Sequence, residues 1–212
     1  MQGSLFAEPA HEVRRPVARV VLLCGPSGSG KTSLTRRLGL PVLALDDFYR
    51  DVGDAALPHL HGLVDWDDPA SWDGASAMAA LVALCSTGRS RVPVYDIPTS
   101  RRTGTASLDT GGSPLLVAEG IFAAELVAAC RRAGVLAAAL CLRQPPAVTF
   151  WRRLARDLSE SRKPPLTLVR RGLRLARAEP TLVARWARLG CTPVSAGEAV
   201  RVVDELLRPA GP

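Results

Sequence analysis

Aromatic side chains are scarce in this sequence, since Trp, Tyr and Phe together make up only 5% of its 212 residues. Hydrophobic residues nevertheless reach 47%, carried mainly by Ala, Val and Leu, and charged residues make up 22%. This composition predicts a packed core, and it favours helices and buried parallel strands over an aromatic-rich all-β fold. The length is typical of one domain, or of one domain with a small lid.

Paired metal ligands are also lacking. None of the five cysteines belongs to a Cys-x-x-Cys pair, so we expect buried, reduced thiols and no zinc site. His59 and His61 form a His-x-His pair without an evident third ligand, and we interpret them as ordinary loop residues.

No apolar run approaches the length of a membrane span. The first 16 residues contain charges and prolines and have no apolar core of the kind that signal peptides carry. We therefore expect a disordered tail over residues 1–16, a single domain over residues 17–208, a cytoplasmic location and no membrane partner.

The formal net charge is +7, and arginine supplies most of the positive charge. A nucleic-acid surface would require a contiguous basic stripe, whereas sites for phosphate and nucleotide require only local groups. The arginines fall in separated clusters, which argues against a nucleic-acid partner, although net charge alone does not decide. The clusters are Arg36-Arg37, Arg101-Arg102, Arg131-Arg132, Arg152-Arg153-Arg156 and residues 170–177.

Short apolar runs alternate with segments of helical pattern, which predicts an α/β fold with a mainly parallel sheet and helices on both of its faces. The expected strands are Ala18–Cys24, Pro41–Leu45, Arg91–Ile97, Leu115–Ala118 and Val135–Leu142. The expected helices are Lys31–Leu38, Ala75–Cys85, Phe122–Arg132, Pro145–Ser159, Leu166–Ala178, Thr181–Leu189 and Ala196–Leu207. Asp51–Asp73 is expected to be an irregular surface excursion, and Thr99–Gly112 a hairpin or a loop.

Residues 25–32 read Gly-Pro-Ser-Gly-Ser-Gly-Lys-Thr and match the phosphate-binding pattern G-x4-G-K-[ST]. The motif follows an apolar strand and precedes a helix, so backbone N–H groups and the helix N-terminus would surround a phosphate. We expect Lys31 to reach the β and γ phosphates of ATP and Thr32 to ligate Mg²⁺. The expected nucleotide-binding residues are Gly25, Ser27, Gly28, Ser29, Gly30, Lys31, Thr32 and Ser33.

The motif predicts a P-loop NTPase fold but does not identify the reaction, since ATPases, GTPases and small-molecule kinases share it. No Asn-Lys-x-Asp element is present, which argues against a GTPase. Carboxylates follow two other apolar runs: Asp46 and Asp47 after the second, and Glu119 after Leu115–Ala118. Ligands of open α/β sheets lie at the carboxyl ends of strands.

We interpret Asp46 as a catalytic carboxylate that orients or deprotonates an acceptor hydroxyl, and as a possible metal contact. A helix N-cap is the competing interpretation, and one of Asp46 and Asp47 can cap while the other acts in catalysis. Glu119 has the position of a Walker-B acid, which holds Mg²⁺ or its waters. Arg152, Arg153 and Arg156 would share one helix face, either as a solvated face or as a lid that closes on the phosphates.

Taken together, these segments resemble the uridine kinase family, within a wider group that includes nicotinamide riboside kinase, phosphoribulokinase and pantothenate kinase. The resemblance runs from about Val20 to Lys163. The segments occur in family order: GPSGSGKT, LDDFYRD, DWDDPASWD, VYDIPTSRR, VAEGIF and an arginine lid, RRLARDLSESRK, at about residues 152–165.

The resemblance implies transfer of the γ-phosphoryl group of ATP to a primary alcohol, which is the 5′-hydroxyl of a nucleoside in the type members. It implies that Asp46 is the general base, that Glu119 is linked to magnesium, and that the lid residues Arg153 and Arg156 contact substrate and ATP phosphates. The implied substrate-binding residues are Tyr49, Asp67, Tyr95, Ser100, Arg102 and Arg153.

Two departures leave the acceptor open. Uridine kinases usually carry a pyrimidine-reading histidine where this sequence has Ser100, and an Arg-Gly-Arg-like run is replaced by Ser161-Arg162-Lys163. The sequence therefore predicts an ATP- and Mg²⁺-dependent kinase for a nucleoside. The alternatives are a P-loop kinase for nicotinamide riboside, pantothenate or a sugar phosphate, and a non-catalytic nucleotide-dependent switch that binds nucleic acid. A homo-oligomer remains open.

Overall fold

A computed structural model of the chain describes residues 16–60, 62–145, 148–149 and 179–208. All of the expected tail except Pro16 lies outside the described residues, and so does the expected arginine-rich lid. The predicted helix Leu166–Ala178 and most of Pro145–Ser159 also lie outside them. What the structure describes is therefore the sheet, its covering helices and the segments that connect them.

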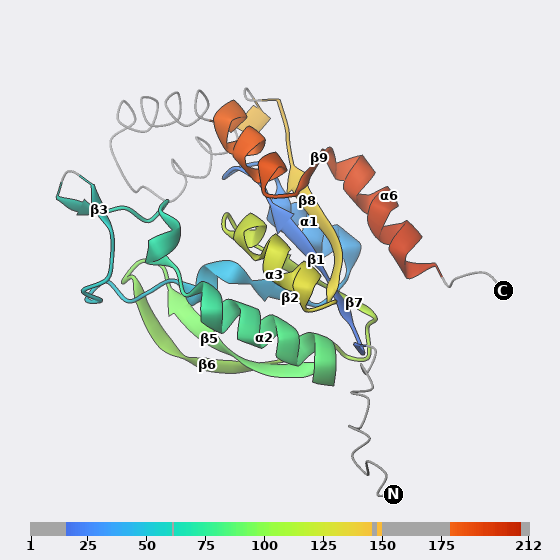
Figure 1. Ribbon diagram of the computed structural model, residues 1–212, viewed down its shortest axis with the longest axis horizontal. Coiled ribbons are helices and arrows are strands. Elements are labelled where there is room, and N and C mark those ends of the chain that lie inside the picture. The colour runs from blue at the N-terminus through green and yellow to red at the C-terminus, as the bar shows by residue number, and fades with distance from the viewer. Residues whose placement is uncertain (1–15, 61, 146–147, 150–178, 209–212) are drawn as a thin grey trace, which may run out of the picture.

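The centre of the molecule is a parallel sheet of five strands in the order β2-β7-β1-β8-β9 (Figure 1). The prediction of an α/β fold with a mainly parallel sheet is thus confirmed. Four of the five expected strands lie in this sheet, whereas the expected strand Arg91–Ile97 lies in a separate two-stranded sheet; β9 was not predicted. β9 has only three residues, two of them exposed and one of them proline, so it leaves no apolar run in the sequence. The strands are β1 (Arg19–Cys24), β2 (Val42–Ala44), β7 (Leu115–Glu119), β8 (Leu136–Leu142) and β9 (Thr192–Val194).

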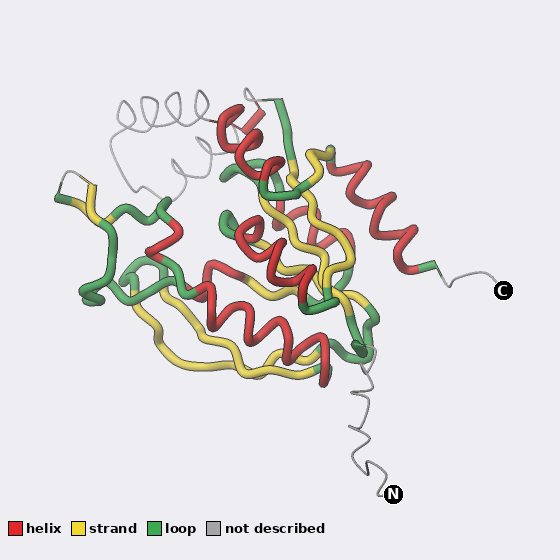
Figure 2. The backbone as a smooth tube through the Cα atoms, viewed as in Figure 1, coloured by secondary structure: helices red, strands yellow, loops and turns green. Residues whose placement is uncertain are grey.

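Helices cover both faces of the sheet (Figure 2). Alternate residues of β1 face opposite sides: Val20, Leu22 and Cys24 belong to one buried cluster, and Val21 and Leu23 to the other. The first cluster is completed by α2 (Gly74–Thr87), α3 (Val127–Arg132) and residues 179–188, and the second by α1 (Lys31–Leu38) and α6 (Ala196–Leu207).

Two antiparallel hairpins stand outside the main sheet. The larger one pairs β5 (Arg89–Asp96) with β6 (Arg101–Asp109) and lies beneath α2 in Figure 1. The sequence left a hairpin and a loop open for Thr99–Gly112, and the structure shows a hairpin. The smaller hairpin, of β3 (His59–Leu60) and β4 (Leu63–Val64), lies in the excursion that was expected to be irregular.

Three short 3-10 helices follow strands or precede α-helices: η1 (Leu45–Phe48), η2 (Pro69–Ser71) and η3 (Ala123–Leu126). The predicted helix Phe122–Arg132 therefore begins as 3-10 helix and becomes α-helical only at Val127. η1 matters most for function, because it carries both aspartates that follow β2.

All five cysteines are free and buried, as expected. Burial raises the pKa of Cys85 to about 12 and that of Cys130 to about 11, so these thiols stay protonated at neutral pH. In the described part of the chain, no helix has the length and apolar character needed to cross a membrane.

A capping box begins α6, the helix that packs against α1 on the sheet. The Ser195 hydroxyl accepts the Glu198 N–H at 3.3 Å, and the Glu198 carboxylate accepts the Ser195 N–H at 2.7 Å. We expect Ser195→Ala to lower the free energy of unfolding by about 1 kcal/mol, or roughly 2–4 °C in Tm. Ser195→Asp is the control that retains a cap, and equal Tm values for the two variants would contradict this role.

Candidate active site

The carboxyl ends of three neighbouring strands meet at one edge of the sheet. In the parallel register Glu119 of β7 lies beside both Leu23 of β1 and Ala44 of β2. The phosphate-binding motif starts directly after β1, and Asp46 comes two residues after Ala44. The strand order alone therefore brings Gly25, Asp46 and Glu119 to the same end of the sheet, where open α/β sheets bind their ligands.

The loop from Gly25 to Thr32 has a backbone that depends on its glycines. Gly28 and Gly30 have φ angles of 83° and 95°, in the left-handed region that other residues rarely adopt. A Cβ atom on Gly25 would lie 2.7 Å from the carbonyl oxygen of Leu142 and 2.9 Å from the hydroxyl of Ser29. The loop is thus packed too closely for a side chain at its first position.

The loop also leaves polar groups without protein partners. Helix α1 begins after Gly30 with no side-chain cap on its first N–H groups, so these groups remain available to an anion. The Ser29 hydroxyl is buried and has no hydrogen-bond partner among the described residues. Thr32 and Ser33 are exposed on the first turn of α1, and Ser27 lies two residues before Ser29 in the same loop. This donor set fits a nucleotide phosphate.

Lys31 turns back over the loop, where its Nζ donates to the carbonyl oxygens of Gly25 at 2.9 Å and Pro26 at 3.4 Å. Its positive charge acts to lower the pKa of both Asp46 and Glu119. The charge of one lysine therefore acts on two half-buried carboxylates at the mouth of the loop. A phosphate group bound there would compete with the two carbonyl oxygens for the ammonium group.

Asp46 and Asp47 are neighbours on η1, yet they face different surroundings. Burial raises the pKa of Asp46, Lys31 opposes this, Asp47 raises it further, and the N–H of Ile121 lowers it. Burial also raises the pKa of Asp47, whose carboxylate accepts the N–H of Tyr95 on the hairpin. Asp46 thus points to the phosphate side and Asp47 to the hairpin, and η1 has no side-chain N-cap at all.

Glu119 ends β7 inside the same cluster. Burial raises its pKa, the charge of Lys31 lowers it and the charge of Asp46 raises it again. The described residues contain no group of three or more His, Cys, Asp and Glu side chains arranged for a metal ion. Two carboxylates and the Thr32 hydroxyl nevertheless fit Mg²⁺, which is commonly held by one or two carboxylates together with waters and substrate phosphates.

Aromatic rings form a wall next to Asp46. The Tyr49 ring lies 5.6 Å from Trp66 in an edge-to-face arrangement, and 5.9 Å from both Tyr95 and Phe122. The Tyr49 hydroxyl donates to the carbonyl oxygen of Trp66 at 3.2 Å. Burial and then the charges of Asp46 and Asp67 raise the pKa of Tyr49, so both carboxylates lie near its hydroxyl.

Asp67 is exposed on the excursion beside this wall, and its carboxylate forms no hydrogen bond or ion pair with the described residues. Tyr95 is buried, and its hydroxyl donates to the carbonyl oxygen of Arg50 at 3.0 Å. Burial raises the pKa of Tyr95, and a hydrogen bond with the Ser100 side chain lowers it. Ser100 has a φ of 53°, the only positive value among described non-glycine residues.

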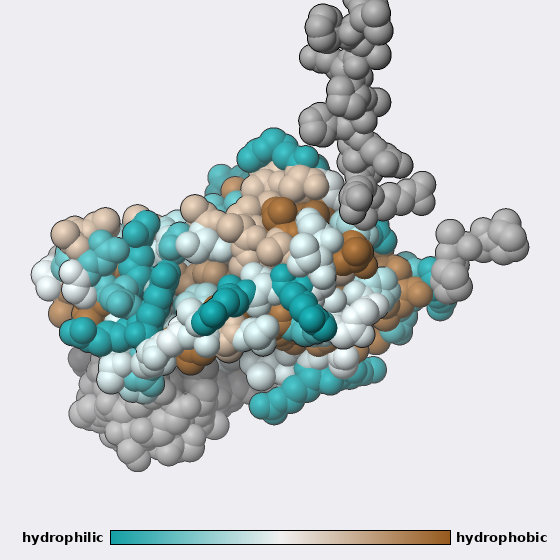
Figure 3. Space-filling view, turned by 90° about the horizontal axis from the view of Figure 1, so that it is seen from below, coloured by the Kyte–Doolittle hydropathy of each residue, from teal (hydrophilic) through white to brown (hydrophobic). Residues whose placement is uncertain are grey.

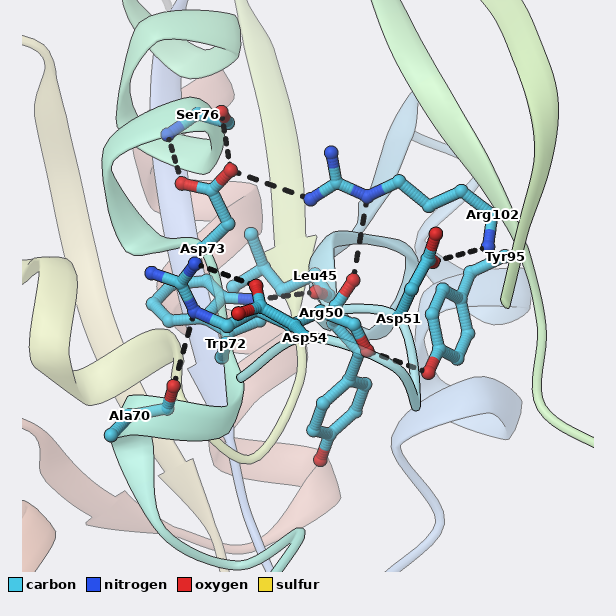
Figure 4. Close-up of polar contacts among 11 residues, drawn as sticks. Leu45, Arg50, Asp51, Asp54, Ala70, Trp72, Asp73, Ser76, Tyr95 and Arg102 are labelled. Carbon is cyan, nitrogen blue, oxygen red and sulfur yellow. Dashed lines mark hydrogen bonds and ion pairs between the residues drawn. The ribbon is translucent and has the colours of Figure 1, made fainter. Parts of the chain in front are cut away.

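Arg102 is also expected on the acceptor side. Its guanidinium contacts the main chain of Tyr49 and the carboxylate of Asp73 (Figure 4). Arg153 and Arg156, expected in the lid, lie outside the described residues. The structure thus brings the expected nucleotide residues, Asp46, Glu119 and the acceptor residues to one side of the sheet edge.

Sequence reasoning missed two supports of this site. A Cβ on Gly120 would lie 2.9 Å from the Leu45 Cβ and 3.0 Å from Asp46 Oδ1, so Gly120 makes room for the segment that carries Asp46. The Trp72-Asp73 pair binds the backbone of η1, as Trp72 Nε1 donates to the Leu45 carbonyl at 2.7 Å. The available signal for Gly120 was its place directly after Glu119. Trp72 and Asp73 belong to the segment DWDDPASWD, but nothing in the sequence indicated that they contact η1.

The fold and this site define the class of the protein as a P-loop kinase. A search of family models finds no match. The chain is 32% identical over 176 residues to a uridine kinase of Deinococcus deserti, covering 76% of this chain and 82% of that one. A uridine kinase of Schizosaccharomyces pombe is 29% identical over 125 residues, which is 55% of this chain and 27% of that protein.

The fold is also that of a putative fructose transport system kinase from Silicibacter sp. TM1040, with a TM-score of 0.58 and 22% identity over 79% of this chain and 87% of that one. The extent and identity of the Deinococcus match show that the chain belongs to the uridine kinase family. The resemblance noted in the sequence is thereby confirmed, and the chain is a phosphotransferase.

The contact between Gly120 and Asp46 leads to a first functional prediction. We expect Gly120→Ala to displace Asp46 and to lower kcat by about 10- to 100-fold, because small displacements of reacting groups are costly. ATP affinity should change little. Gly104→Ala, where a Cβ meets nothing within 4 Å, is the control, and equal kcat values for both variants would contradict the steric argument.

The environment of Asp46 predicts a pH dependence. The pKa of Asp46 is raised, and a carboxylate can act as a base only when it is ionised. If Asp46 is the base expected from the sequence, activity should therefore fall with decreasing pH earlier than for an ordinary aspartate. Asp47→Asn removes a neighbouring negative charge that raises this pKa, so the acidic limb of kcat/KM should move to lower pH. Asp109→Asn, an exposed acid at the far end of the hairpin, should leave the limb in place. If the acidic limb of the kcat/KM profile does not move in Asp47→Asn, the limb is due to the ionisation of a group other than Asp46.

Proposed function

We propose that this protein transfers the γ-phosphoryl group of ATP to a primary hydroxyl group of a nucleoside. One observation supports the proposal most strongly. Lys31, Asp46 and Glu119 lie together at the mouth of the phosphate-binding loop, next to the aromatic rings around Tyr49, and Asp67 lies beside the same rings. The relatives named uridine kinases make a nucleoside the first acceptor to test.

On the nucleotide side, the backbone from Gly25 to Gly30 and the start of α1 would hold the phosphates. Lys31 would leave the carbonyl oxygens that it now contacts and bind the β and γ phosphates. Thr32 and Glu119, with Asp46 near them, would hold Mg²⁺, which when bound neutralises charge on the phosphates. Arg153 and Arg156 remain proposed lid residues.

On the acceptor side, Asp46 would accept the proton of the hydroxyl as it attacks, since its charge interacts both with Lys31 of the loop and with Tyr49 of the aromatic wall. Burial suits this role, because a raised pKa strengthens the carboxylate as a base. Asp67 would bind two neighbouring hydroxyls of a ribose, and its carboxylate is available for them. The rings of Tyr49 and Tyr95 would contact the planar base.

Ser100 supports a second candidate acceptor. It occupies the position of the pyrimidine-reading histidine, and its side chain bonds to Tyr95, whose hydroxyl also reaches the Arg50 carbonyl. A short hydroxyl group so engaged contributes little to recognition of a pyrimidine. Nicotinamide riboside, pantothenate and sugar phosphates therefore belong in the acceptor screen.

A nucleic-acid-binding switch receives no comparable support. On the face seen in Figure 3, hydrophilic side chains occur in separate groups between paler and apolar surface. The arginines are likewise separated into clusters along the sequence, whereas nucleic acids require a contiguous basic stripe.

The test is release of ADP with each acceptor, using wild type, Asp46→Asn and Lys31→Ala. We expect a nucleoside to raise ADP release well above ATP hydrolysis in the wild type. Asp46→Asn should keep ATP binding and lose transfer by roughly 100-fold or more, as expected for removal of a general base. Lys31→Ala should weaken ATP binding itself.

Two outcomes would contradict the proposal. If no acceptor stimulates ADP release, the chain is not a kinase of these compounds. If Asp46→Asn transfers as fast as the wild type, Asp46 is not the base. Stimulation by pantothenate or a sugar phosphate alone would support the second candidate and exclude the nucleoside.

A further inference from the structure

Arg102, at the start of β6, connects three parts of the molecule. We propose that Arg102 is a positioning residue that holds the Tyr49 main chain, and with it η1 and Asp46, in the geometry needed for the acceptor. This inference rests on the proposed kinase function. It assigns Arg102 a role through the protein backbone, in place of the substrate contact that the family resemblance implies.

Arg102 contacts the residues that directly follow η1, and it also contacts the cap of α2 (Figure 4). Its Nε donates to the Tyr49 carbonyl oxygen at 3.4 Å, and its Nη2 lies 3.4 Å from Asp73 Oδ2. Its backbone N–H donates to Asp51 Oδ1 at 2.7 Å. Main chain and side chain of one residue thus bind positions 49 and 51, on either side of Arg50.

Asp73 is a fixed partner because it is the N-cap of α2. Its Oδ1 accepts the Ser76 N–H at 3.0 Å, and its Oδ2 accepts the Ser76 hydroxyl at 2.7 Å. Burial raises the pKa of Asp73, but the hydrogen bonds from Ser76 and Arg102 outweigh burial and lower it. Arg102 therefore joins the hairpin to a helix that is packed on the main sheet.

The segment that carries Asp46 is held mainly through its carbonyl oxygens. Those of Leu45 and Phe48 accept from Trp72 Nε1 at 2.7 Å and from the Asp73 N–H at 2.9 Å. The next two accept from the hairpin: that of Tyr49 from Arg102, and that of Arg50 from the Tyr95 hydroxyl at 3.0 Å. These two hairpin side chains determine where the Tyr49 ring lies relative to Asp46.

The ion pair is too exposed to be a major source of stability. The Arg102 and Asp73 side chains are 36% and 25% accessible, and pairs of this kind contribute little to the free energy of folding. Loss of Arg102 should thus leave the fold intact and loosen the segment. Small displacements of reacting groups are felt strongly in catalysis.

The experiment compares Arg102→Met with Arg89→Met. Arg89 pairs with Asp109 at 2.7 Å across the other end of the same hairpin, and that pair joins only β5 and β6. We expect Arg102→Met to lower kcat/KM for the acceptor by about 10- to 100-fold with the KM for ATP unchanged. Arg89→Met should match the wild type. Arg102→Lys, which keeps the charge without the planar fork, should recover part of the loss.

Asp73→Asn tests the path through the helix cap. Asn also caps helices, so this variant weakens the ion pair and keeps an oxygen for the Ser76 N–H. The Ser76 hydroxyl, which donates to Asp73 Oδ2, can accept from the Asn amide instead. If Arg102 acts through Asp73, the double variant Arg102→Met/Asp73→Asn should be no worse than Arg102→Met. Fully multiplicative losses would show that Asp73 acts independently, and would overturn this path.

Amide hydrogen exchange of residues 45–51 reports positioning without any acceptor. Exchange there should be faster in Arg102→Met and unchanged in Arg89→Met. Equal exchange in both, or an equal loss of acceptor kcat/KM in both, would overturn the positioning role. A wild type that phosphorylates no acceptor would instead refute the proposed function, and the exchange result would still decide whether Arg102 positions the segment.

Discussion

The parallel register of β2, β7 and β1 is the constraint on which the rest of the structure depends. It places Ala44, Glu119 and Leu23 side by side, so the residues that follow these strands lie close together in space. The phosphate-binding loop and two acids then share one small volume. Buried strands with helices on both faces keep this register, since a slip by one residue would exchange the two hydrophobic faces of β1.

Close approach of the backbones lets the phosphate-binding loop, Asp46 and Glu119 pack together, and the charge of Lys31 favours the ionised form of the two acids. Glycines at positions 25 and 120 stand where a Cβ would collide with Leu142 or with Asp46. Burial alone would favour protonated Asp46 and Glu119, and the ammonium group of Lys31 opposes this. A cluster of this kind keeps carboxylates available at neutral pH and still leaves room for phosphate oxygens.

The acceptor side is built differently. No strand of the main sheet carries Tyr49, Asp67 or Tyr95; they come from η1's exit, the excursion and the outer hairpin. Their arrangement depends on hydrogen bonds to main-chain carbonyl oxygens, such as those from Trp72 and the Tyr95 hydroxyl. The proposed nucleotide-binding residues are thus positioned by strands of the main sheet. The proposed acceptor residues are positioned by segments outside that sheet. Differences in acceptor within one fold are expected to arise there.

The sequence by itself determined the fold class, the phosphate-binding loop and the order of the acids, because each depends on local pattern: apolar runs, glycine spacing and the residue after a strand. It also indicated the family, through five motifs in order. Only the tertiary structure decided which aspartate faces the phosphate side, since Asp46 and Asp47 are adjacent and differ only in what packs against them. It also decided that Thr99–Gly112 belongs to a hairpin, and it alone revealed β9 and the links from Trp72, Asp73 and Arg102 to η1 and to Tyr49 directly after it. Those links join residues 25 or more positions apart, and no local pattern records a contact formed by folding.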